Sequence, residues 1–144
     1  MQQVRGKSLE TQLDHLCEHV NKMGYHAHKN HPKRLGDGTR VQGEPFDYEI
    51  LLPNWHACFD AKECSAQTFP LANIHPHQVK FMEDFEKQNG VAFFLIFFSH
   101  LNEFYYLTFR ELMGFWKRME EGGRKSFRKE ELTEEFYLPK KGGV

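Results

Sequence analysis

The chain has 144 residues, of which 40% are apolar and 15% aromatic, which is enough material for one hydrophobic core and predicts a single domain over residues 1–144. A formal net charge of −1 gives no overall basic excess, so any nucleic-acid site must come from local clusters of charge. Three cysteines without a Cys-x-x-Cys pair, and an N-terminus without a signal-peptide core, favour a reducing cytoplasm. The longest apolar run, Val91–Phe98, is shorter than the roughly 20 residues that cross a bilayer, so we expect no membrane association.

The first predicted element is an amphipathic helix. Ser8 is a suitable N-cap, leucines recur at helical spacing up to Met23, and Gly24 is a typical residue after a last turn. Composition and alternation then predict, in chain order, a strand (25–30), a loop rich in glycine, proline and charge (31–44), two antiparallel strands around a Pro-Asn-Trp turn (46–52 and 56–64) and irregular chain (65–73).

The second half predicts two more helices and two more strands. Thr108 with Glu111 three residues later forms a capping box in front of a helix that ends at a Gly-Gly pair. The order indicates an α/β fold, with a single mixed β-sheet of about five strands flanked by helices. The remaining predicted elements are a helix (75–90), strands (91–98 and 103–107), the capped helix (108–123), a short helix (128–135) and a disordered tail (139–144).

Two acids and a lysine stand on the predicted strand pair. Side chains alternate along a strand, so Asp60 and Lys62 share one face of the sheet, and Asp47 begins the neighbouring strand. Converging carboxylates suit a hard cation such as Mg²⁺ or Mn²⁺, and the lysine would orient the attacking water or stabilise charge on a phosphate. The alternative is that both aspartates are exposed strand-end residues, with Lys62 as their solvated ion-pair partner.

The spacing from Asp47, through twelve residues, to Asp60-Ala61-Lys62 resembles the PD-(D/E)-x-K nuclease signature. The segments "FDAKE", "FPLANIHPHQ", "GVAFFLIFF", "FYYL", "FW" and "GRKSFRKEEL" follow one another in the order found in RecU-type Holliday junction resolvases of Gram-positive bacteria and their phages. The resemblance runs from about Gly6 to Leu138.

This resemblance implies a restriction-endonuclease-like fold and a Mg²⁺-dependent endonuclease, with Mn²⁺ able to substitute. Its implied role is in DNA recombination and repair, where a homodimer nicks opposed strands of a four-way junction in a bacterial cytoplasm. By motif, Asp47, Asp60 and Gln78 are the implied metal-binding residues, Lys62 the catalytic lysine, and Glu10 a first-helix glutamate directed at the same metal. From the residues alone, Gln78 is equally an exposed helix glutamine and Glu10 equally a solvated first-turn acid.

The chain differs from the family at three points. Asp60 stands where the family usually has glutamate, Phe46 replaces a small hydroxyl residue, and only residues 31–44 are available where the family inserts a long basic stalk. A shortened stalk favours a phage origin and keeps two other functions open. These are a structure-selective nuclease for branched or flapped DNA, and a non-catalytic module that binds junctions.

The remaining candidate sites involve histidines, cysteines and clusters of basic residues. The histidines, among them His15 and His19 one helical turn apart and the "HAHKNH" and "HPH" runs, raise the question of a zinc site, although surface histidines are the favoured interpretation. Cys58 and Cys64 have no partners for nucleophilic catalysis and are interpreted as small, partly buried strand residues. Basic residues suited to DNA phosphates are Lys33, Arg34 and Arg40 in the loop and Lys117, Arg118, Arg124, Lys125, Arg128 and Lys129 near the C-terminus. The alternative for the second group is a solvated tail balanced by acids.

Overall fold

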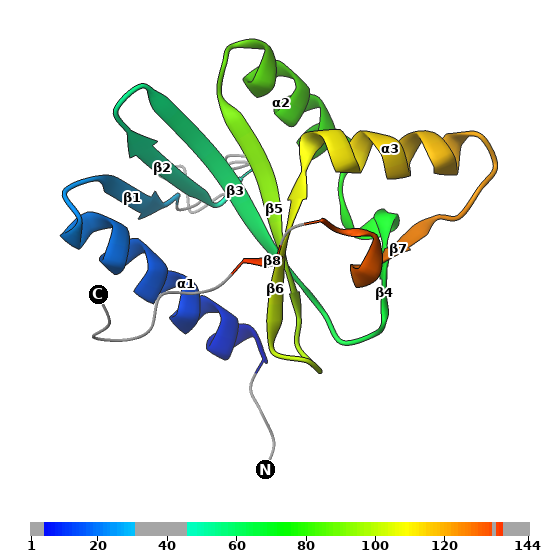
Figure 1. The fold of residues 1–144 in the computed structure, drawn as a ribbon, viewed down its shortest axis with the longest axis horizontal. Helices are drawn as coiled ribbons and strands as arrows, with labels where there is room; N and C mark the ends of the chain where they lie inside the picture. The colour runs from blue at the N-terminus through cyan, green and yellow to red at the C-terminus, as the bar shows by residue number, and fades with distance from the viewer. Residues whose placement is uncertain (1–4, 31–45, 134, 137–144) are drawn as a thin grey trace, which may run out of the picture.

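One mixed sheet forms the centre of the protein (Figure 1). The computed structural model describes residues 5–30, 46–133 and 135–136, so the predicted loop over 31–44 and the tail over 139–144 lie outside it. The strand order is β1-β2-β3-β5-β6-β8; β3 pairs with β5 in parallel and the other neighbours are antiparallel. The α/β prediction is confirmed, and a two-residue sixth strand is added. The strands are β1 (His26–Lys29), β2 (Tyr48–Leu52), β3 (Trp55–Cys64), β5 (Val91–Phe98), β6 (Glu103–Thr108) and β8 (Glu135–Phe136).

Helices cover both faces of the sheet because strand side chains alternate between them. On one face, α1 (Arg5–Lys22) packs Leu13 and Leu16 against β-strand residues such as Phe59 and Phe93. On the other face lie α2 (Pro76–Lys87), α3 (Phe109–Glu120) and the small sheet of β4 (Thr68–Pro70) and β7 (Ser126–Arg128), around Phe94 (Figure 1). In the part of the chain that the structure describes, no helix has the length and apolar character needed to cross a membrane.

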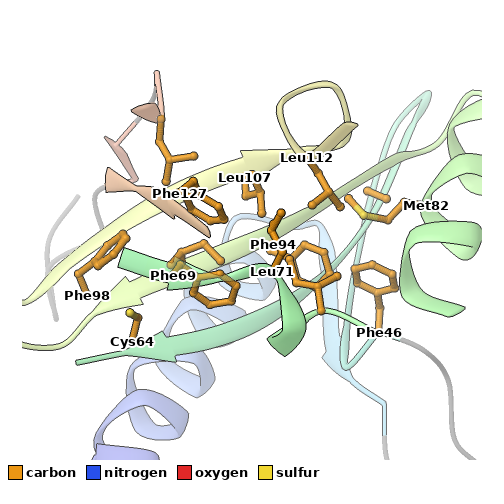
Figure 2. Packing of buried hydrophobic residues seen from close by; sticks show 14 of the residues in the cluster. Phe46, Cys64, Phe69, Leu71, Met82, Phe94, Phe98, Leu107, Leu112 and Phe127 are labelled. Atoms are coloured by element: carbon orange, nitrogen blue, oxygen red, sulfur yellow. The ribbon is translucent and has the colours of Figure 1, made fainter. Parts of the chain in front are cut away.

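Aromatic side chains fill the core on the α2 and α3 face (Figure 2). Phe46 packs against Phe94 with ring centroids 5.3 Å apart, close to Met82 of α2. At the other end of the cluster, Phe69 stacks on Phe127 at 5.2 Å. The four rings are all at most 1% exposed, so they form the buried contact between the sheet and the elements on this face: Phe46, Phe69, Phe94 and Phe127.

Three local predictions are wrong. The first helix begins at Arg5, so Ser8 lies inside its first turn and does not cap it. Residues 65–73 are not irregular, because β4 (Thr68–Pro70) pairs with β7 (Ser126–Arg128) and a 3₁₀ turn follows over Leu71–Asn73. The same pairing limits the predicted helix over 128–135 to one 3₁₀ turn, η2 (Lys129–Glu131), because a strand occupies its start.

The predicted cap of α3, the β2–β3 turn and the end of α1 at Gly24 are confirmed. Thr108 Oγ1 accepts the Glu111 backbone N–H at 3.2 Å, and the Glu111 carboxylate accepts the Thr108 N–H at 3.3 Å. Asn54 takes φ of 60° in the two-residue turn between β2 and β3, and Gly24 takes φ of 91° after α1. The Asn54 turn fixes where β2 ends and β3 begins, and so the register between these two strands.

Candidate active site

Strand β3 presents Asp60 and Lys62 side by side on the face covered by α2. Lys62 Nζ lies 3.2 Å from Asp60 Oδ2 and 5.8 Å from the centre of the Phe94 ring. Asp60 is 8% exposed, and Asp60 and Gln78 are the polar or charged residues buried in the described chain. Burying a carboxylate is costly unless it is paired, so Asp60 differs from the predicted alternative of a solvated strand-end acid.

Asp47 reaches the same point from the neighbouring strand. Tyr48 is paired with Phe59 across β2 and β3, so the antiparallel register brings Asp47, one residue before β2, opposite Asp60. The Asp47 carboxyl group shares a hydrogen bond with that of Asp60. Two acids that are well separated in the sequence therefore meet above one end of the β2–β3 pair.

The electrostatics of this pair indicate a place for a cation. The pKa of Asp47 rises from 3.8 to about 6, first because protein atoms desolvate its carboxyl group and second because the Asp60 charge repels a second negative charge. Lys29 and Lys62 oppose that rise without cancelling it. Asp47 is nevertheless exposed as a residue, so its carboxyl group is accessible from solvent.

The donor set is small and made of oxygen. Among the described residues, no three side chains of the His, Cys, Asp and Glu types surround one point. Mg²⁺ commonly binds proteins through one or two carboxylates and retains several waters, so the Asp47–Asp60 pair fits such an ion. A tetrahedral zinc site with nitrogen and sulfur ligands does not fit these two residues.

Gln78 holds Asp60 in place from the first turn of α2. Its Nε2 donates to Asp60 Oδ2 at 3.1 Å, and its Oε1 accepts the His75 backbone N–H at 3.3 Å, as part of the cap of α2. Gln78 is 4% exposed, so it is not the exposed helix residue of the predicted alternative. Its amide nitrogen faces the carboxylate, and direct binding of a metal by the amide oxygen stays a prediction.

Glu10 forms an ion pair with Lys29, a residue that the sequence did not single out. Its Oε1 lies 2.8 Å from Lys29 Nζ, and this contact lowers the pKa of Glu10. Lys29 in turn lies near enough to Asp47 to lower the pKa of that acid. The structure thus pairs Glu10 with Lys29 and not with Asp47 or Asp60. The only sequence signal for Lys29 was its place at the end of a short alternating strand.

The predicted DNA-binding residues fall into two groups. Lys33, Arg34 and Arg40 lie outside the described residues. In the C-terminal group, Arg118 donates to Glu131 at 2.7 Å and to the Ser126 carbonyl at 2.8 Å, and Lys129 pairs with Glu103 at 2.9 Å. Arg118 and Lys129 are therefore engaged in ion pairs and hydrogen bonds within the protein, next to β7. The members of the group that are exposed are Lys117, Arg124, Lys125 and Arg128.

The cysteines agree with their predicted structural role. Cys58 and Cys64 are buried, and burial raises the pKa of the Cys58 thiol to about 12. The Cys64 thiol donates to the Thr68 carbonyl at 3.2 Å. A thiol that is protonated and buried is a poor nucleophile, so the Cys58 thiol does not serve as the nucleophile of this face.

A mixed sheet with two acids and a lysine converging on its central strands is typical of restriction-endonuclease-like domains. The family model described as Recombination protein U matches residues 4–143, and the chain belongs to this family, RecU. The resemblance inferred from the sequence blocks is therefore confirmed.

Relatives named Holliday junction resolvase RecU occur in several bacilli. The protein of Bacillus cereus (strain B4264) is 42% identical over 89 residues, which are 61% of this chain and 44% of the relative. That of Bacillus subtilis (strain 168) is 39% identical over 113 residues, covering 75% and 54% of the two chains. That of Geobacillus kaustophilus (strain HTA426) is 33% identical, over 89% of this chain and 72% of the relative. The chain spans about half the length of the curated relatives it matches first.

Proposed function

We propose that the chain is a metal-dependent DNA endonuclease that resolves four-way junctions by paired nicks. The observation that carries this proposal is the meeting of Asp47, Asp60 and Lys62 on one face of the sheet, in a chain of the RecU family. The names of its relatives support the junction as substrate, and their bacterial hosts support a bacterial or phage origin.

Asp47 and Asp60 would hold the metal, with Mg²⁺ as the expected ion and Mn²⁺ as a substitute. When bound, such an ion polarises a phosphate oxygen and favours hydroxide over water as nucleophile. The raised pKa of Asp47 supports this assignment, because a cation between the two carboxylates would allow both to be ionised. Oxygen ligands from two adjacent strands also suit a hard cation.

The other residues of the site would position the reacting groups. Lys62 can donate a hydrogen bond to the attacking water or to a phosphate oxygen, at the point where negative charge develops. Gln78 keeps Asp60 in one orientation, since both Gln78 Nε2 and Lys62 Nζ contact Oδ2 of that carboxylate. Exposed cations near α3 and β7 are suited to phosphate contacts that carry no sequence information.

Paired nicks require two active sites related by a two-fold axis, so we expect a homodimer. Light scattering on the protein, free and with junction DNA, measures this directly. A stable monomer in both states would exclude concerted paired cleavage by one assembly.

A cleavage assay with matched variants tests the assigned residues. Lys62→Met keeps the length of the side chain but removes its charge, and Lys80→Met makes the same change on the exposed surface of α2. We expect junction cleavage in Mg²⁺ to fall about 100-fold or more in the Lys62 variant and to be unchanged in the Lys80 variant. Equal activity of the two variants would remove Lys62 from the reaction.

A further inference from the structure

A pair of histidines on the edge strand β1 is not used by the candidate active site. His26 and His28 are two residues apart on β1, so both side chains lie on the same face of this edge strand. Their ring centroids are 4.9 Å apart, and His26 Nε2 lies 2.8 Å from His28 Nδ1. Two imidazole nitrogens at that distance share one proton or bind one cation.

Asn30 determines which nitrogen of His28 carries the proton. The Asn30 Nδ2 group donates to the Phe46 carbonyl at 3.1 Å and to Glu49 Oε1 at 3.2 Å, and both of these atoms are acceptors. The amide oxygen of Asn30 must therefore be the atom that lies 3.0 Å from His28 Nε2. Because an amide oxygen only accepts, His28 carries its hydrogen on Nε2 and directs the lone pair of Nδ1 towards His26.

We propose that His26 Nε2 and His28 Nδ1 form a binding site for a divalent late transition metal ion of the Zn²⁺ type. Zinc–histidine bonds of about 2.0–2.1 Å place two ligand nitrogens about 2.9 Å apart at a right angle and about 3.3 Å apart at a tetrahedral angle. The observed 2.8 Å is close to this span, and each ring would rotate so that its lone pair turns from the other nitrogen to the shared ion. Imidazole nitrogen is a ligand that such ions prefer over the carboxylate oxygen suited to Mg²⁺.

The surroundings of His28 are those of an oriented metal ligand. Its second ring nitrogen is bound by Asn30, Asn30 is held by Glu49, and the other oxygen of Glu49 lies 3.2 Å from His56 Nε2. Metal-binding histidines commonly have such a hydrogen-bonded chain behind them, which fixes the ring and its tautomer. Water would complete the coordination, since the described residues bring no third histidine, cysteine or acid to this point.

The other His-x-His pair has a different geometry. His75 and His77 stack with an angle of 14° between ring planes and centroids 5.4 Å apart. Nearly parallel rings do not direct their edge nitrogens at a shared point. The proposal is therefore specific to the pair on β1 and does not follow from the number of histidines.

Zn²⁺ titration of the whole chain by calorimetry tests the proposal, with millimolar Mg²⁺ present and Asp60→Asn as the background, so that the acidic site does not take up zinc. We expect one Zn²⁺ ion to bind, with the dissociation constant raised about tenfold or more by His26→Asn, by His28→Asn and by Asn30→Ala. The matched controls are the single variants His15→Asn and His19→Asn, each of which removes one imidazole from α1 and should leave the affinity unchanged. Zinc affinity that is lost in the control or retained in the β1 variants would overturn the assignment.

A spectroscopic readout does not depend on how well the variants fold. Nitrogen-15 spectra of the histidine rings should show His28 protonated at Nε2, with zinc shifting His28 Nδ1 and His26 Nε2. A hydrogen on His28 Nδ1, or zinc-induced shifts confined to other histidines, would overturn the proposal.

Discussion

Removing the charge of Asp47 should stabilise the metal-free protein. The pKa of Asp47 is raised in the folded state, so its contribution to stability is fully present below pH 3.8 and is lost as the pH rises through about 6. At pH 8 the folded protein therefore holds an ionised Asp47 carboxylate that is partly desolvated and is repelled by the Asp60 carboxylate. Asp47→Asn removes one of the charges and can still donate a hydrogen bond to Asp60.

The size of this gain follows from the change in pKa. A rise from 3.8 to about 6 corresponds to at most about 3 kcal/mol of unfolding free energy at pH 8. Asp47 is exposed as a residue, so solvent screening reduces the expected gain to about 1 kcal/mol. For a chain of this size, that gain raises the melting temperature by about 3 °C.

Thermal unfolding in EDTA at several pH values, compared with the same scans in Mg²⁺, measures the effect. The variant should be more stable than the parent at pH 8 in EDTA, with a difference that shrinks towards pH 5, and should lose the stabilisation that the parent gains from Mg²⁺. Asp84→Asn, an exposed acid on α2 paired with Lys80, is the matched control and should show no such pattern. A variant equal to or less stable than the parent at pH 8 in EDTA would refute the argument that the two acids repel each other.

Four further substitutions separate structural from functional residues. Gln78→Ala leaves the buried Asp60 carboxylate without one donor, and urea unfolding should show a loss of about 1–3 kcal/mol. Thr108→Ala removes the cap of α3, which should cost about 1 kcal/mol while junction cleavage per folded molecule is kept. Arg118→Ala should lower stability through loss of its hydrogen bonds to Glu131 and Ser126. Lys125→Ala should leave stability unchanged and reduce the slope of log DNA affinity against log salt concentration by about 1. Loss of DNA affinity in the Arg118 variant without loss of stability would reverse that assignment.

Local chemistry predicted those parts of the fold that depend on neighbouring residues. Helix α3 was predicted from its capping box and the β2–β3 turn from Pro53 and Asn54, because both signals act within a few residues. The pairing of β4 with β7 was missed because Phe69 and Phe127 meet through tertiary packing, and no short segment of sequence contains that information. The start of α1 was missed because the helix begins at Arg5, N-terminal to Ser8, although serine is also a good N-cap residue.

The candidate site could be predicted in part for the same reason. Alternation along a strand placed Asp60 and Lys62 on one face, and the structure agrees. The position of Asp47 opposite Asp60 depends on the register of two strands, which the sequence alone did not determine. Lys29 was missed because its proximity to Asp47 arises from a third strand, and the Glu10–Lys29 pair could not be foreseen from helix periodicity.

Mapping the nicks in a four-way junction with each strand labelled in turn tests the proposed function most directly. In Mg²⁺, the proposal predicts nicks at symmetry-related positions on two opposed strands, with little cutting of a linear duplex or a flap of the same sequence. Asp60→Asn should abolish these nicks and retain junction binding. Junction binding without cleavage in either Mg²⁺ or Mn²⁺, or equal cutting of all three substrates, would contradict it.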